Sequence, residues 1–315
     1  MLDIRGELRD QPLRVGISTR SLFDLEAEHE VFVQDGVAAY VELQREREDV
    51  LVEKGSGFKV VEKLLGMNED DNQPYVEVIL LSKNSPDLSL RAFNSIKEYG
   101  LNIKHGSFTS GRTLAPFIQS WGIDLFLSND TVDVQAVVTA GTAAARLGSP
   151  PEVEQSKDLD DEVRLAFDGD AVVFSPESDM IFKEKGLHAF FEHEKMNAKK
   201  PMSVGPFGGG FLKKLSKLRE IHLDEHGVSK VRIGIVTARN APAHERVVHT
   251  LRAWGTPADE AHFVGTNSKA PILQAMDAHI FFDDQEKHVR GAAPVVPSGH
   301  VPGPHSPDEP VIPAN

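Results

Sequence analysis

Residues 163–174, with the sequence VRLAFDGDAVVF, decide how the fold and the chemistry of this chain are interpreted. A short apolar run, Val163–Phe167, is followed at once by Asp168, Gly169 and Asp170. Near-continuous apolar runs of this length are typical of strands buried on both faces of a parallel sheet. Because ligands bind at the carboxyl ends of such strands, two carboxylates that converge there predict a site where one attacks phosphorus and the other moves a proton.

The pattern of elements around this stretch occurs twice along the chain. Residues 76–130 align without a gap with residues 231–285 at an offset of 155, and residues 14–42 align with residues 164–192 at an offset of 150. The shared positions include Gly100 and Gly255, Phe108 and Phe263, Pro116 and Pro271, and Phe126 and Phe281. The alignment predicts one folding unit present in two copies.

The two copies differ in their acidic and basic residues. The first copy has Ser18 and Arg20 in place of Asp168 and Asp170, Leu114 in place of Lys269, and Ser128 and Asn129 in place of Asp283 and Asp284. Since the first copy folds without these groups, the fold itself does not require them. The comparison within one chain therefore indicates chemistry in the second copy.

The predicted fold class is α/β, with parallel strands that alternate with helices. Strands are expected at 13–18, 76–81, 123–127, 163–167, 231–236 and 278–282, and a helix at 243–254 that ends at Gly255. We expect residues 1–150 to form a degenerate Rossmann-like half and residues 151–290 a catalytic half, with a polar linker at 149–162 and a helical cap insert at about 175–228. Residues 291–315, rich in Pro, Gly and Ser, are expected to be a disordered or surface-lying tail.

Composition restricts the class of protein. The 315 residues carry a formal net charge of −14, which argues against nucleic acid and anionic membranes as partners. The chain has no cysteine, so disulfides and thiolate metal sites are excluded. No run approaches the roughly 18 apolar residues of a membrane span, and the charged N-terminus lacks a signal peptide pattern, so we expect a cytoplasmic protein.

Three further polar elements follow strands or begin helices in the second copy. Thr237 follows the strand at 231–236, where a hydroxyl can hold a phosphoryl oxygen. Lys269 precedes a helix that opens at Pro271 and can neutralise phosphate charge. Asp283 and Asp284 end the strand at 278–282 and supply the hard oxygen ligands that suit Mg²⁺.

This order of motifs resembles the haloacid dehalogenase (HAD) superfamily of phosphotransferases. More closely, the segments FDGDAVVFSPESD, GPFGGGFLKKL, VTARNAPAHERV, NSKAPIL and HIFFDDQ together are similar to the cytosolic type I 5′-nucleotidases. The first copy shares the likeness in TRSLFD, LLSKNSP and DLFLSND, so it covers most of residues 14–290. The resemblance implies a HAD-like Rossmannoid sheet with a helical cap, and hydrolysis of nucleoside 5′-monophosphates by a chain that forms homo-oligomers.

The resemblance also implies roles for individual residues. Asp168 would be the nucleophile that forms an aspartyl-phosphate, and Asp170 would protonate the leaving oxygen and then activate water. Thr237 would bind the phosphate and Lys269 would stabilise it. The metal set would be Asp283 and Asp284, with Asp168 and the backbone carbonyl of Asp170.

Several alternatives remain open at this point. Arg239 and Asn240 either contact the substrate or only shape their loop. Gly208 and Gly209 lie in a glycine-rich stretch, 205–210, that is a hinge, a close approach to the nucleotide or a flexible connector. The rival functions are a phosphatase for a sugar phosphate or other small phosphomonoester and a non-catalytic nucleotide-binding regulator. The first half is structural, an assembly surface or a degenerate nucleotide-sensing site.

Overall fold

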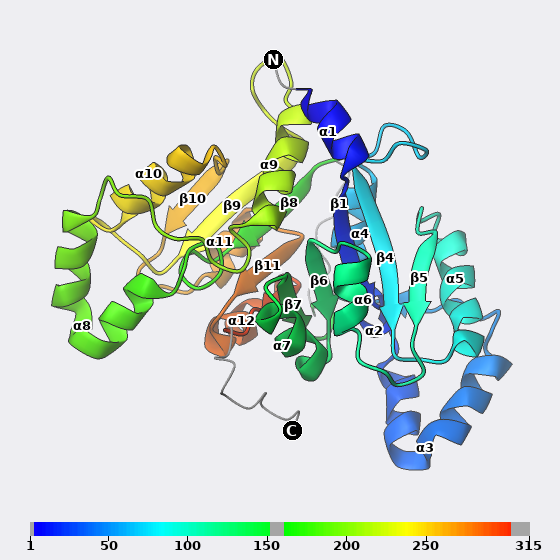
Figure 1. Cartoon of the computed structure of the whole chain (residues 1–315). Helices are drawn as coiled ribbons and strands as arrows, with labels where there is room; N and C mark the ends of the chain where they lie inside the picture. Colours follow the sequence, from blue (N-terminus) through cyan, green and yellow to red (C-terminus); the bar gives the residue numbers. More distant parts are fainter. Residues whose placement is uncertain (1–2, 152–160, 304–315) are drawn as a thin grey trace.

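The computed structural model describes residues 3–151 and 161–303. It is an α/β structure built on a single ten-stranded, mostly parallel sheet with helices around it (Figure 1). The strand order is β10-β9-β8-β11-β12-β7-β6-β1-β4-β5. The predicted fold class, α/β with a large parallel sheet, is therefore confirmed.

The sheet strands are β1 (Leu13–Ser18), β4 (Val76–Ser82), β5 (His105–Phe108), β6 (Leu125–Ser128), β7 (Ala143–Leu147), β8 (Val163–Phe167), β9 (Val231–Thr237), β10 (Glu260–Phe263), β11 (Ile280–Asp283) and β12 (Ser298–His300). A separate small ribbon joins β2 (Phe23–Asp24) and β3 (Glu53–Lys54). The helices are α1 (Ile4–Asp10), α2 (Thr19–Leu22), α3 (Glu26–Glu46), α4 (Phe58–Leu65), α5 (Ser89–Glu98), α6 (Ala115–Ser120), α7 (Thr131–Thr139), α8 (Glu177–Met196), α9 (Gly210–Ile221), α10 (His244–Trp254), α11 (Ala270–Ala275) and α12 (Glu286–Ala292).

The apolar runs found in the sequence form the interior strands of this sheet. Each of the six predicted strands overlaps an observed one, and every residue of β8 is buried. The predicted helix α10 begins at His244 and is ended by Gly255, whose φ of 67° lies in the left-handed region that glycine tolerates. Continuous hydrophobicity was a reliable signal here because both faces of these strands are covered.

The two halves of the sheet have the same strand order and register. In the first half the order is β5-β4-β1-β6-β7, and Ile17 lies opposite Leu80 and Leu127. In the second half the order is β10-β9-β8-β11-β12, and Phe167 lies opposite Ile235 and Phe282. Residues that align in the sequence therefore occupy equivalent points in the two halves.

The halves join where β7 and β12 pair antiparallel, through Gly299 opposite Leu147 and His300 opposite Arg146. This junction corrects the expectation of a tail from residue 291 onward. Within that segment α12 continues to Ala292, β12 lies between β11 and β7, and Val301 is fully buried. Residues rich in Pro, Gly and Ser fit here because small side chains allow close packing in the middle of a sheet. The predictions for 304–315 and for most of the 149–162 linker lie outside the described residues.

The helical insert of the second half is less uniform than the predicted cap at 175–228. Helices α8 and α3 project from opposite sides of the molecule (Figure 1), and each bends at a glycine, Gly186 or Gly36, with positive φ. Helix α9 instead packs on the sheet and on α1, and its residues Leu212, Leu215 and Leu218 are in the core. Helix α9 is thus part of the core, because its apolar stripe requires burial, and a cap formed by α8 and its flanking loops stays a prediction.

No helix within 3–151 and 161–303 is both long enough and apolar enough to cross a membrane.

Candidate active site

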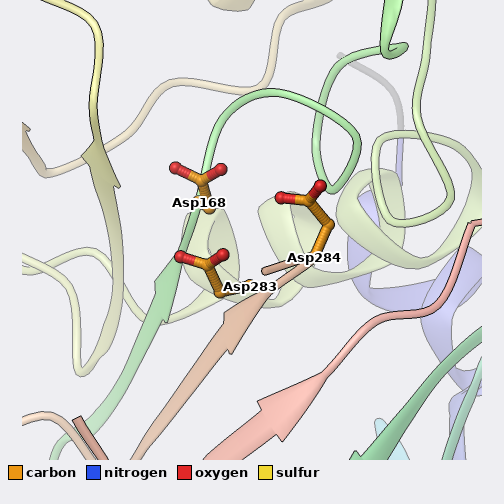
Figure 2. Close-up of side chains that lie close together, drawn as sticks. All are labelled: Asp168, Asp283 and Asp284. Carbon is orange, nitrogen blue, oxygen red and sulfur yellow. The ribbon is translucent and has the colours of Figure 1, made fainter. Parts of the chain in front are cut away.

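Three aspartates converge where two neighbouring strands of the second half end (Figure 2). Asp168 follows β8, Asp283 is the last residue of β11, and Asp284 comes next. One carboxylate oxygen from each residue lies within 4.8 Å of the other two. The parallel pairing of β8 with β11 brings these side chains together, since parallel strands end at the same edge.

Lys269 supplies the positive charge inside this cluster. It lies at the N-terminus of α11 and is buried, with its Nζ donating to Oδ1 of Asp168 at 2.7 Å and to Oδ2 of Asp283 at 2.6 Å. Burial alone would lower the pKa of the ammonium group, but the two carboxylates raise it above its ordinary value. Lys269 is therefore charged in the folded protein.

One lysine does not balance three carboxylates. Burial raises the pKa of Asp168 to about 7, against the opposing effect of Lys269. Burial, together with the charges of Asp168 and Asp283, raises the pKa of Asp284 to about 8. For Asp283, hydrogen bonds from His288 and Lys269 outweigh burial, so that its pKa lies below its usual range.

This crowding fits a divalent cation. Three hard oxygen donors within 4.8 Å of one another form a set of the kind that Mg²⁺ prefers, and a cation there would offset the burial and the repulsion that raise the pKa values of Asp168 and Asp284. The structure brings together the carboxylates of three of the four predicted metal ligands, and their role as ligands stays a prediction. The fourth, Asp170, was expected to contribute its backbone carbonyl, and its carboxylate is not part of the cluster.

Thr237 lies beside the loop that carries the aspartates. It is the last residue of β9, is buried, and its Oγ1 accepts a hydrogen bond from the backbone N–H of Arg239 at 3.3 Å. A Cβ atom added to Gly169 would lie 3.1 Å from that hydroxyl oxygen. Glycine between the two aspartates therefore allows β9 to approach the loop closely.

Asp170 faces a different partner from the other aspartates. Nε and Nη2 of Arg239 donate to its two carboxylate oxygens, each at 2.7 Å, in a bidentate pair. Arg239 is buried, whereas Asn240 is exposed. The structure thus gives Arg239 a clear contact within the site and leaves the substrate contacts of both residues as predictions.

Sequence reasoning missed the buried carboxylate of Glu194, which lies on α8. Its Oε2 pairs with Nη1 of Arg239, while its Oε1 accepts from Arg246 at 2.9 Å and from Ser178 at 2.7 Å. Burial would raise the pKa of Glu194, but the two arginines and the hydroxyl hold it below its ordinary value. A chain of charges therefore links the projecting helix α8 to Asp170 through Arg239.

A signal for this network was present in the sequence alignment. Arg246 aligns with Arg91, and in the first half Nη1 of Arg91 donates to Glu28 and to Gln44, both at 2.9 Å. Gln44 aligns with Glu194, so an arginine that fastens the projecting helix is present in both halves. Arg239 has no such counterpart, because Asn84 stands at its position.

The glycine-rich stretch, 205–210, packs against residues 172–174, which follow Asp168 and Asp170 in the chain. A Cβ atom on Gly208 would lie 2.1 Å from the backbone oxygen of Val173, and one on Gly205 would lie 2.4 Å from that of Phe174. Gly209 has open space at the same position. Two of these glycines are thus required by close packing against 172–174, and substrate contact by Gly208 and Gly209 stays a prediction.

Comparison with known proteins agrees with this geometry. The sequence profile of the 5′-nucleotidase family matches residues 6–307. Human cytosolic 5′-nucleotidase 1B is 33% identical over 292 residues, which cover 89% of this chain and 47% of the human protein. The chain spans about half the length of this curated relative. The match extends over both halves of the sheet and over every residue of the carboxylate cluster, and on this evidence the chain belongs to the 5′-nucleotidase family.

Proposed function

We propose that this chain hydrolyses nucleoside 5′-monophosphates to nucleoside and phosphate, with Mg²⁺ as its cofactor. The observation that carries the proposal is the meeting of Asp168, Lys269, Asp283 and Asp284 at one edge of the sheet, in a chain of the 5′-nucleotidase family. The name of the human relative supports the nucleotide as substrate and a cytosolic location. That support is indirect, because this chain covers 47% of the relative's length.

In the proposed reaction a carboxylate oxygen of Asp168 attacks phosphorus. An aspartyl-phosphate forms as the bond from phosphorus to the 5′ oxygen breaks, and Asp170 gives that oxygen its proton. Asp170 then takes a proton from the water that attacks the aspartyl-phosphate, which releases phosphate and restores Asp168. In the structure the bidentate pair with Arg239 fixes the orientation of the Asp170 carboxylate.

The remaining residues of the site balance charge and position the phosphoryl group. Lys269 neutralises part of the charge on Asp168 and on the phosphoryl oxygens, and Thr237 offers a hydroxyl beside Gly169. Mg²⁺ held by Asp168, Asp283 and Asp284, with the backbone carbonyl of Asp170, would supply further positive charge to the same oxygens.

The first half is proposed to be a degenerate repeat of the catalytic HAD-like half. Its support is the ungapped alignment together with the equal strand order and register. The division near residue 150 is retained in this proposal as the boundary between repeats, although both contribute strands to one sheet. Homo-oligomer formation is a further prediction, which light scattering on the purified chain tests.

A panel of phosphomonoesters tests the proposed reaction. Phosphate release is measured from the four common nucleoside 5′-monophosphates and from several sugar phosphates, with Mg²⁺ and with EDTA. Release from nucleotides that is abolished by EDTA supports the proposal. A sugar phosphate that outperforms every nucleotide establishes the rival phosphatase instead, and binding of nucleotides without any release establishes the non-catalytic regulator.

The Asp168→Asn substitution tests the nucleophile. Turnover should fall by at least roughly 10³-fold, because an amide cannot form the covalent intermediate. Asp124→Asn is the matched control, since Asp124 pairs with Lys214 outside the carboxylate cluster and should leave turnover nearly unchanged. Unchanged turnover in Asp168→Asn would refute the assignment.

A further inference from the structure

The first half contains a cavity of about 570 Å³ at the carboxyl ends of β1, β4 and β6. Ser18, Ser82 and Ser128, the last residues of these three strands, line it. By sequence alignment and strand register they stand where the second half has Asp168, Thr237 and Asp283. The cavity is therefore the counterpart of the candidate active site, with hydroxyl groups in place of carboxylates.

This counterpart lacks the groups that would hold a phosphate and its cation. Leu114 directly precedes α6 where Lys269 directly precedes α11, and Ser128 with Asn129 replaces the Asp283–Asp284 pair. Neutral hydroxyl and amide groups bind divalent cations far less well than carboxylates do. The first half therefore lacks the lysine and the aspartate pair that would neutralise phosphate and hold a cation in the second half.

The cations at the cavity wall are already paired with carboxylates. Nη2 of Arg20 lies 2.8 Å and 2.9 Å from the two carboxylate oxygens of Glu26. Nζ of Lys83 lies 3.0 Å from Asp130 and 2.9 Å from Asp133. Of the lining residues, Arg20 and Lys83 are balanced by Asp130 and Asp133, and Glu26 beside the cavity pairs with Arg20, so an anionic ligand would have to compete with these carboxylates, whereas a neutral ligand would not.

Aromatic rings from α3 form another part of the wall. Phe32 and Tyr40 line the cavity with their ring centres 5.9 Å apart, edge to face, and the His29 ring stacks on Phe32 at 5.7 Å. Phe32 remains 42% exposed, which leaves ring surface available to a ligand. Flat heterocyclic rings stack favourably on such side chains.

Uncharged polar groups form the rest of the wall. Ser82 and Ser128 line the cavity, and each Oγ accepts a hydrogen bond at 3.1 Å from a backbone N–H, that of Asn84 or that of Asp130. Each hydroxyl group keeps its own proton to donate, which a ligand that carries hydroxyl groups can accept.

We propose that the first-half cavity binds a neutral, flat-ringed ligand with several hydroxyl groups, of the nucleoside class, and that it does so without metal. The choice of nucleosides among such compounds rests on the proposed function, whose product is a nucleoside. The cavity volume lies within the range of about 300–1,000 Å³ that small-molecule sites occupy.

Calorimetry on the metal-free full chain tests this proposal. Adenosine, guanosine, cytidine and uridine are titrated separately, with the matching 5′-monophosphates in parallel. At least one nucleoside should bind, and it should bind more tightly to the first half than its monophosphate does. Because binding is measured without turnover, failure of the phosphate-release assay alone would leave this result intact, and the reverse also holds.

Matched tryptophan substitutions assign the binding to one half. Val37 lines the cavity from α3 and is 64% exposed, so Val37→Trp should fill the cavity without disturbing the core and weaken binding roughly tenfold or more. Leu187 aligns with Val37 on α8 and is 55% exposed, so Leu187→Trp is the control that should leave this binding unchanged.

Three results would overturn the proposal: no nucleoside binds, Val37→Trp leaves binding unchanged, or a monophosphate binds this cavity more tightly than its nucleoside.

Discussion

At the carboxyl ends of β8 and β11, three buried or half-buried aspartates meet, and one lysine pairs with two of them, Asp168 and Asp283. The raised pKa values of Asp168 and Asp284 express the cost of placing these groups together out of water. Under the proposed function, this cost prepares a site for a cation and a phosphate.

The Asp284→Asn substitution separates these two effects. It removes a half-buried carboxyl group that must either carry charge beside Asp168 and Asp283 or take up a proton on folding, so the metal-free variant should be more stable than the wild type by on the order of 1 kcal/mol. Saturating Mg²⁺ should stabilise the wild type by about 2.7 kcal/mol at one hundred times its dissociation constant and the variant by much less. Urea unfolding with and without Mg²⁺ measures both quantities, and an equal response of the two proteins would contradict the assigned metal site.

The lowered pKa of Glu194 predicts that its contribution to the stability of the protein decreases at acidic pH. Its pKa in the folded protein is lower than its ordinary value of 4.5, so its contribution to stability is present above that value and is lost as the pH falls through the lower, folded pKa. The difference in unfolding free energy between the wild type and Glu194→Gln should therefore be largest near neutral pH and shrink below about pH 4.5. Unfolding measured at intervals between pH 7 and pH 3 tests this, and a difference that grows on acidification would be inconsistent with it.

At the scale of elements, the projecting helices α3 and α8 are each held by a buried arginine, but the carboxylate that pairs with the arginine comes from a different position in each helix. In the first half the carboxylate that meets Arg91 comes from Glu28, with Gln44 beside it. In the second half the carboxylate that meets Arg246 comes from Glu194, with Ser178 beside it. Glu28 aligns with Ser178 and Gln44 with Glu194, so the carboxylate has changed places between two facing positions of the helix.

This exchange of positions predicts that a second substitution partly restores the stability lost on replacing Glu194. Glu194→Gln alone leaves the buried Arg239 and Arg246 without their shared carboxylate and should cost about 3–5 kcal/mol of unfolding free energy. Adding Ser178→Glu recreates the first-half arrangement and should restore part of that loss. Urea unfolding of the two single variants and the double variant gives the coupling, and simple additivity would rule out the proposed equivalence.

The elements that could be predicted from sequence were those whose signal is local. Val163–Phe167 and Val231–Thr237 are continuous apolar runs, and the aspartates that follow strands were found with them. Strands β5 and β10 were missed because these edge strands are short, partly exposed and polar. Glu194 was missed because a glutamate on a helix is usually solvated, and its burial depends on arginines that lie about fifty residues away in sequence.

At the scale of the whole molecule, β12 is the element that makes one sheet of two halves. Gly299 lies at the junction, where an added Cβ atom would be 2.9 Å from Ala145 Cβ and 2.9 Å from Phe282 Cδ1. The residues Ser298–His300 were not predicted as a strand because three small or polar residues carry no hydrophobic pattern. Their burial comes from the strands on either side and from α12, which packs on β12.

Gly299→Val tests whether the halves depend on this junction. Overpacking between Ala145 and Phe282 should lower the unfolding free energy by about 1–3 kcal/mol and should affect both halves, since the sheet is continuous. Gly303→Val is the matched control, because that glycine is exposed with open space around it, and it should change stability by no more than about 0.5 kcal/mol. Hydrogen exchange measures the local stability of each half separately. Faster exchange confined to the second half would contradict the dependence of both halves on this junction.

The position of β12 also bears on how the polypeptide is made. Of the ten strands, the one that covers the free side of β7 is the last to leave the ribosome. Until then the nascent first half exposes an unpaired edge whose alanines and leucine offer little resistance to contact with other chains. Synthesis of this protein therefore passes through a stage in which chaperone protection of residues 143–147 would favour correct assembly over aggregation.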